Sequence, residues 1–374
     1  MNSNRKTVLN PESSLADLPP CTLVSCSGIS ESICRLTIQD ISGSYTIPYI
    51  QSSPELTVRL EWRGDVESAS IVLFKSNQEV VGKEVFRTAG GVTFEHLARG
   101  EYDIEGRWRN RTGAEIGRTM LRRIGIGTVL TAIGDSITEG YYGYGFWRDN
   151  LDLQADMFPP DAVSKDGRNF PQFAPTSALY PQIREHYGQM VNCTQSWMTS
   201  LNDGLTDAWQ QPVFIANEGW GGSTCGSYLE MIQNDQGWQQ RMRRLRPQVW
   251  LIHLGVNDER GKVAADIFSR NMEKIVDVLV NEYQADPQMI FVAKPSYDYH
   301  PDAEAILNAY RIQIDGLIEK LEVRLGPDFF SAYSKDKEKL YGDDQAHPNP
   351  TGITLMAELW TKSILSSLPK GCGT

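Results

Sequence analysis

The chain has 374 residues, of which 40% are hydrophobic and 22% charged, and its formal net charge is −11 with a pI near 5.1. This length suffices for two domains with separate cores. The acidic balance argues against nucleic acid or an anionic membrane as the main partner, because phosphate groups bind to basic surfaces. Apolar runs stay below the ~18 residues that span a membrane, so we expect a globular protein without membrane contact.

Residues 1–34 are polar, include Pro19-Pro20, and are predicted to be a tail and lead-in. No apolar segment follows Met1, so we expect no signal peptide and favour the cytoplasm unless a leader has been removed. The six cysteines fit neither a zinc site nor a disulfide framework. We expect no metal and no cofactor.

Residues 35–126 show a period of two that is typical of strands. Leu56, Val58, Leu60 and Trp62 alternate with polar residues, and glycine-bearing turns separate several such runs. Short antiparallel strands with this spacing predict a β-sandwich domain, with a hairpin turn at residues 110–113.

Residues 127–374 change to continuous apolar runs that alternate with helical patterns. The runs, each predicted to be a buried strand, cover 129–133, 213–216, 249–254 and 289–293, with a weaker one at 329–332. The helices are predicted at 265–283, 303–321 and 351–368. Such alternation predicts a parallel sheet covered on both faces.

Two irregular stretches interrupt this domain, at residues 141–180 and 197–209. The first is rich in aromatic residues but is broken by charges, so it has no continuous apolar stripe. Loops of this length inside a compact domain are usually functional walls or lids.

Two fragments that follow strands contain a nucleophile and a flexible backbone. Gly134-Asp135-Ser136-Ile137-Thr138-Glu139 follows the first run, where open α/β sheets place their ligands. Backbone N–H groups at the start of the next helix are unpaired and can face an anion. After the second run, Asn217-Glu218-Gly219-Trp220-Gly221-Gly222-Ser223-Thr224 would allow close backbone approach to a ligand, although alone it also reads as a plain turn.

Two later fragments supply an amide and a histidine. Gly255-Val256-Asn257-Asp258 follows the third run, and its side-chain amide can donate to an oxyanion, although this sequence is also a common helix cap. Asp344 precedes His347 by three residues and can accept from its Nδ1–H, which leaves Nε2 as a base. His253 lies inside a predicted strand and is interpreted as a core residue.

The four fragments resemble, in order and at strand ends, the four sequence blocks of the SGNH (GDSL-type) hydrolase superfamily. The resemblance covers about residues 128–368 and implies a three-layer α/β/α, flavodoxin-like sheet. It further implies Ser136 as nucleophile, Asp344 and His347 as its partners, and an oxyanion hole of Ser136, Gly222 and Asn257. The Gly-x-Ser-x-Gly elbow of the α/β-hydrolase fold is absent.

The resemblance implies an esterase, and we expect it to act on small acyl esters, with acetyl groups on a carbohydrate favoured. Sugar-stacking aromatics would be Tyr141, Trp147, Trp197, Trp209 and Trp220, with simple loop packing as the competing interpretation. Three alternatives stay open: a lipase or thioesterase, an acyltransferase, and a non-catalytic carbohydrate-binding protein. The N-terminal sandwich would bind polysaccharide, mediate oligomerisation or form a wall of the cleft, and a packing or structural role is favoured.

Overall fold

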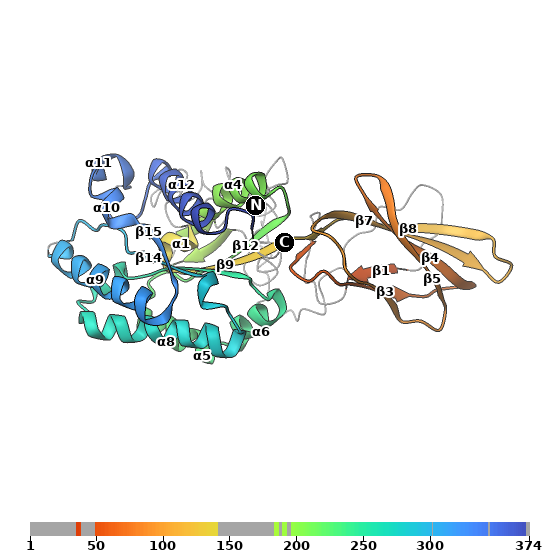
Figure 1. Ribbon diagram of the computed structural model, residues 1–374, viewed down its shortest axis with the longest axis horizontal. Coiled ribbons are helices and arrows are strands. Elements are labelled where there is room, and N and C mark those ends of the chain that lie inside the picture. Colours follow the sequence, from red (N-terminus) through yellow and green to blue (C-terminus); the bar gives the residue numbers. More distant parts are fainter. Residues whose placement is uncertain are drawn as a thin grey trace, which may run out of the picture.

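The computed structural model describes residues 35–38, 49–140, 183–186, 189–192, 196–300, 302–342 and 345–371. Along the chain, an N-terminal β region (35–126) is followed by an α/β region (128–371), and Figure 1 shows the two side by side. Of the predicted site residues, Tyr141, Trp147 and Asp344 lie outside the described residues, as do the predicted tail and the interruption at 141–180.

The N-terminal β region contains two sheets. A three-stranded antiparallel sheet has the order β1-β3-β6, and a five-stranded sheet has the order β2-β8-β7-β4-β5, in which only the β2–β8 pair is parallel. Its strands are β1 (Arg35–Ile38), β2 (Tyr49–Gln51), β3 (Leu56–Glu61), β4 (Val66–Lys75), β5 (Gln78–Phe86), β6 (Gly91–Phe94), β7 (Gly100–Asn110) and β8 (Glu115–Ile126).

The two sheets share one hydrophobic core. Leu56 and Val58 of β3 are fully buried while Arg59 is exposed, so the period of two correctly predicted which face is inside. Residues of both sheets, such as Phe94 of β6 and Trp108 of β7, belong to the same buried cluster. The predicted hairpin turn joins β7 to β8, where Gly113 N–H donates to Asn110 O at 3.0 Å.

The α/β region is built on a five-stranded parallel sheet. Its strands are β9 (Thr128–Gly134), β12 (Val213–Gly219), β13 (Val249–His253), β14 (Ile290–Lys294) and β15 (Arg324–Asp328), in the order β12-β9-β13-β14-β15. Numbered along the chain this is 2-1-3-4-5, the flavodoxin-like order. The fold class expected from the sequence is confirmed. A separate hairpin of β10 (Ile183–His186) and β11 (Gln189–Asn192) precedes β12.

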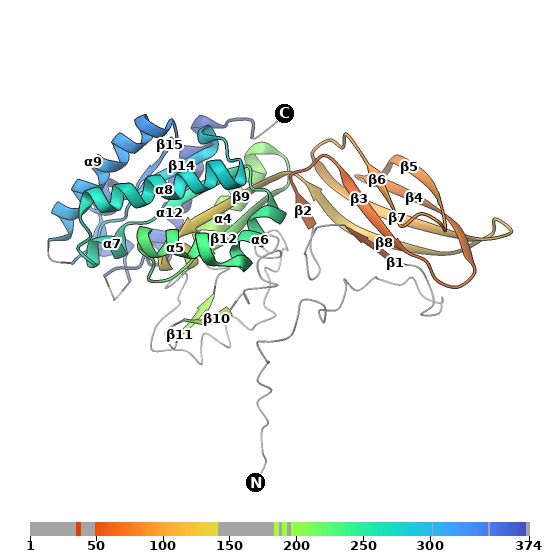
Figure 2. The same ribbon diagram turned by 90° about the horizontal axis from the view of Figure 1, so that it is seen from below.

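Helices cover both faces of this sheet, as Figures 1 and 2 show. Alternate residues of each strand enter opposite cores: Val129 packs toward α5, α6, α8 and α9, and Leu130 toward α4, α10 and α12. The helices are α1 (Ser136–Glu139), α4 (Trp197–Trp209), α5 (Cys225–Asn234), α6 (Gln236–Leu245), α7 (Val256–Arg260), α8 (Ala265–Tyr283), η5 (Pro287–Met289), α9 (Ala303–Leu321), α10 (Phe329–Tyr333), α11 (Lys337–Leu340) and α12 (Pro350–Ser367). No described helix combines the length and apolarity that crossing a bilayer requires.

Two of the predicted elements are wrong. Residues 329–332 form helix α10 instead of a strand, because Asp328 accepts from Ser331 N–H at 2.9 Å and caps a new helix; the last strand precedes it. Residues 197–209 form helix α4 instead of an irregular loop. Its apolar residues follow a helical spacing, and Ser196 caps its start.

Candidate functional site

The strand order reverses between β9 and β13, and their carboxyl ends therefore form the switch point at which open α/β sheets bind ligands. Ser136 follows β9 directly, and Asn257 lies in α7 just beyond β13. The first and third fragments are thus neighbours at one edge of the sheet.

Ser136 is the first residue of α1. Asp135 caps this helix, with Oδ1 accepting from Ile137 N–H at 3.0 Å, and Gly134 makes the exit from β9. A Cβ on Gly134 would lie 2.0 Å from Thr138 Oγ1, so only glycine fits there. The Oγ of Ser136 lies 2.7 Å from His347 Nε2, although 211 positions separate the two residues.

The loop that holds His347 is fixed on both sides of the imidazole. Gly342 N–H donates to His347 O at 2.8 Å, and a β-bridge pairs Tyr341 with Pro348. Asn349 donates from Nδ2 to the carbonyls of Lys339 and Tyr341 and caps α12 through its Oδ1. These contacts hold the loop on both sides of His347 in place.

Gly222 has a positive φ of 78° and is exposed, whereas its neighbour Gly221 is buried. Its N–H has no acceptor among the residues that the structure describes. The strand β12 runs three residues further than predicted, so that this loop begins only after Gly219.

Asn257 and Asp258 both contact the loop that follows β12. Asn257 Nδ2 donates one of its two hydrogens to Ser223 O at 3.0 Å, and Asp258 accepts from Cys225 N–H at 2.9 Å. The carboxylate of Asp258 thereby binds the first turn of α5. The contact between Asp258 and Cys225 was not predicted from the sequence, because an aspartate that follows an asparagine at the start of a helix usually only caps that helix.

Burial shifts the pKa of three side chains at the carboxyl ends of β9 and β13. Burial raises the pKa of Asp135 to about 6, and a hydrogen bond from Ile137 N–H opposes the rise. Burial likewise raises the pKa of Asp258 to about 6. It lowers the pKa of His253 to about 3, so this histidine is a neutral core residue, as the sequence suggested; Ser296 Oγ is 3.2 Å from its Nε2.

Of the aromatic side chains expected to contact a sugar, two belong to the core instead. Trp197 is fully buried and stacks on Trp360 at 5.7 Å between centroids. Trp209 is also buried, and its Nε1–H donates to Leu368 O at 2.9 Å. Trp220 is 46% exposed and directly precedes Gly221. Of the three described aromatics in this set, only Trp220 is exposed enough to contact a ligand.

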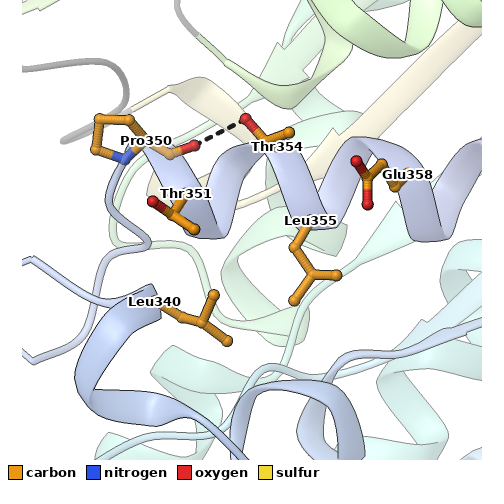
Figure 3. Close-up of a pocket in the computed structure, with 6 residues that line it drawn as sticks. All are labelled: Leu340, Pro350, Thr351, Thr354, Leu355 and Glu358. Carbon is orange, nitrogen blue, oxygen red and sulfur yellow. Dashed lines mark hydrogen bonds between the residues drawn. The ribbon is translucent and has the colours of Figure 1, made fainter.

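The described residues contain no group of three or more acids, histidines or cysteines that could hold a metal ion. A depression of about 470 Å³ lies along the first half of α12 and is lined by Leu340, Pro350, Thr351, Thr354, Leu355 and Glu358 (Figure 3). Its lining includes neither Ser136 nor His347, so it lies outside the site.

Residues 183–355 match the model of the GDSL-like lipase/acylhydrolase family. This stretch is a GDSL-like acylhydrolase domain. The match covers the fragments with Gly222, Asn257 and His347 but begins after Ser136, which precedes the long interruption. No curated protein matches the chain.

Solved structures of acylhydrolases are similar to this domain at low sequence identity. A carbohydrate acetylesterase from Xanthomonas citri is 11% identical, covering 89% of this chain and 75% of its own, with a TM-score of 0.48. A lipase/acylhydrolase from Enterococcus faecalis is 15% identical over 64% of this chain and 96% of its own, with a TM-score of 0.42. A psychrotrophic esterase from Pseudoalteromonas sp. is 16% identical over 64% and 97%, with a TM-score of 0.41. At these values the likenesses say nothing about substrate.

Proposed function

We propose that the protein is a serine esterase that cleaves small acyl esters, with acetylated carbohydrates as its substrates. The observation that supports this most is the 2.7 Å contact between Ser136 Oγ and His347 Nε2 at the switch point of the sheet. A hydroxyl within reach of an imidazole base is the arrangement that activates a serine nucleophile.

The mechanism would be two-step acyl transfer. His347 Nε2 takes the Ser136 proton as Oγ attacks the ester carbonyl, and it returns that proton to the leaving alcohol. Water, deprotonated by the same nitrogen, then cleaves the acyl-enzyme. Asp344 is proposed to accept from His347 Nδ1–H and to stabilise the imidazolium.

The oxyanion of each tetrahedral intermediate would be held by three donors. These are the N–H of Ser136, the N–H of Gly222 and the second hydrogen of Asn257 Nδ2. In support, Gly222 N–H has no acceptor within the described part of the chain, and Asn257 uses only one amide hydrogen on Ser223. Loss of one such donor typically lowers kcat by about 10²–10³.

The carbohydrate part of the proposal depends on Trp220, whose half-exposed ring adjoins the Gly221-Gly222 turn. An indole face offers a flat apolar surface for a sugar ring. The charges between residues 148 and 168 also argue against an apolar channel for a long acyl chain.

The test measures p-nitrophenyl esters of two to twelve carbons and acetate release from acetylated xylo-oligosaccharides. Ser136→Ala should lower kcat on p-nitrophenyl acetate at least ~10³-fold with an unchanged fold. Trp220→Ala should raise KM for the oligosaccharide and leave KM for p-nitrophenyl acetate unchanged. Ile312→Ala, which removes an exposed apolar side chain of α9, is the control and should change neither.

The outcomes separate the candidate functions. An active Ser136→Ala variant would exclude the proposed nucleophile. A preference for acyl chains of eight carbons or more would favour a lipase or thioesterase. Sugar binding without turnover of any ester would favour the non-catalytic alternative.

A further inference from the structure

We infer that Glu139 is a positioning residue that aims the Gly222 N–H of the proposed oxyanion hole. This inference depends on the esterase function proposed above. Glu139 is 1% exposed and lies three residues after Ser136, in the same short helix. Burying a carboxylate costs free energy unless it is hydrogen-bonded. The hydrogen-bond partners of Glu139 therefore indicate its role.

The backbone of α1 ties Glu139 rigidly to the nucleophile. Glu139 N–H donates to Asp135 O at 2.9 Å, and Gly140 N–H donates to Ser136 O at 3.1 Å. Gly140, in a left-handed conformation with φ 107°, ends the helix immediately after Glu139. The Glu139 carboxylate is therefore held at a fixed position relative to the Ser136 hydroxyl.

The end of β12 and the loop after it contact helix α1 directly. Asn217 Nδ2 donates to Glu139 O at 3.2 Å, and the Glu139 side chain accepts from Gly221 N–H through Oε2 at 2.8 Å. The two chains approach so closely that a Cβ on Gly219 would lie 2.3 Å from Glu139 N.

Between residues 219 and 223, all backbone N–H groups but one donate to an acceptor that the structure describes. Gly219 N–H donates to Asn217 Oδ1 at 3.0 Å, Trp220 N–H to Gly134 O at 2.9 Å, and Gly221 N–H to Glu139. Ser223 N–H donates to Trp220 O at 3.2 Å. Between residues 219 and 223, Gly222 is thus the only one whose N–H lacks an acceptor among the described residues.

The Gly221 contact determines how that remaining donor is presented. With Gly221 N–H held by Glu139, the peptide plane before Gly221 is fixed, and rotation about Gly221 is the main freedom left to the Gly222 N–H. Without the carboxylate, Gly221 and Gly222 are free to turn, because glycine backbone resists rotation least. Misaligned donors stabilise an oxyanion poorly, since this stabilisation depends on preorganisation.

The experiment compares Glu139→Ala, Glu139→Asp and Glu139→Gln with wild type on p-nitrophenyl acetate. Glu139→Ala should lower kcat by 10- to 100-fold and change KM less than threefold. Glu139→Asp keeps the charge but withdraws the acceptor by one methylene, so it should also lose at least tenfold. Glu139→Gln retains an amide oxygen for Gly221 N–H and should stay within fivefold of wild type.

Asp235→Ala is the matched control, because Asp235 also accepts from backbone N–H groups, those of Gly237 and Trp238, at the start of α6. It should lower the melting temperature without changing kcat. If Glu139→Ala and Glu139→Asp keep kcat within threefold, or if the Gln variant is as impaired as the Ala variant, the inference is wrong. Ser136→Ala is assayed alongside: if it stays active, the esterase proposal fails; if only the Glu139 variants stay active, the positioning role alone fails.

Discussion

The buried ion pair between Arg241 and Glu218 should be a major determinant of stability. The two side chains are 3% and 2% exposed, and they meet side-on, with Nε to Oε1 at 3.1 Å and Nη2 to Oε2 at 2.8 Å. Glu218 lies at the end of β12, between Asn217 and Gly219. Arg241→Met would keep most of the apolar stem but leave a buried carboxylate without its guanidinium.

Breaking such a pair from one side costs about 3–5 kcal/mol, because the remaining charge is desolvated and uncompensated. For a domain of this size each kcal/mol lowers the melting temperature by roughly 2–4 °C. Arg241→Met should therefore lower it by roughly 6–20 °C. Arg241→Met/Glu218→Gln should recover part of this loss, since the second change removes the stranded charge.

The assays are a thermal melt, which gives the melting temperature, and urea unfolding, which gives the free energy, both followed by tryptophan fluorescence at pH 7.5. Arg270→Met is the matched control, because Arg270 pairs with Asp266 one helical turn away and both side chains are more than 60% exposed. Such surface pairs are worth about 0.3–0.5 kcal/mol. If Arg241→Met costs no more than Arg270→Met, or if the double variant is less stable than the single one, the reasoning is refuted.

Two further predictions concern glycine packing and pH. Gly316→Ala in α9, where a Cβ meets nothing within 4 Å, should stabilise the protein by about 0.5–1 kcal/mol. Gly219→Ala should instead fail to fold or melt at a much lower temperature, because its Cβ would lie 2.3 Å from Glu139 N. Thermal melts of the two variants and wild type test this. Burial raises the pKa of Asp258 to about 6, so the folded protein keeps a proton that the unfolded chain loses above pH 4. Stability from this group therefore falls as pH rises from about 4 to 6. Asp258→Asn should gain stability over wild type across that window, and equal pH slopes in urea titrations would contradict this.

The sequence predicted those parts of the fold that depend on periodicity. Helices 265–283 and 303–321 were predicted with the bounds that the structure has, because each carries a regular apolar stripe. Residues 329–332 were predicted as a strand but form a helix, since four apolar or small residues fit a buried strand as well as a helix. The capping contact between Asp328 and Ser331, three residues apart, decides between them, and this local signal was overlooked beside the apolar pattern.

The candidate site was likewise predicted from the sequence only in part. The pairing of Ser136 with His347 was predicted because both are chemically distinctive residues in recognisable fragments. The contact of Glu139 with Gly221 joins residues 82 apart, and neither residue type is diagnostic by itself. Trp197 and Trp209 were assigned to the substrate because composition does not reveal which face of a helix is buried.

The junction between β8 and β9 determines where the N-terminal β region lies relative to the α/β sheet. Strand β8 passes into β9 through Gly127 alone, where a Cβ would lie 1.9 Å from Pro212 O. Thr128 N–H donates to Pro212 O at 3.0 Å, and Arg99 donates to Gln211 Oε1 at 2.8 Å, so the joint is packed and hydrogen-bonded.

The region therefore joins the sheet at the amino end of β9, and Ser136 follows its carboxyl end (Figure 1). The seven residues of β9 span about 23 Å at ~3.3 Å each. The described strands of the β region thus lie beyond the amino end of β9, whereas Ser136 follows its carboxyl end. Polysaccharide binding, oligomerisation and a role as a wall of the cleft therefore stay as proposals for this region.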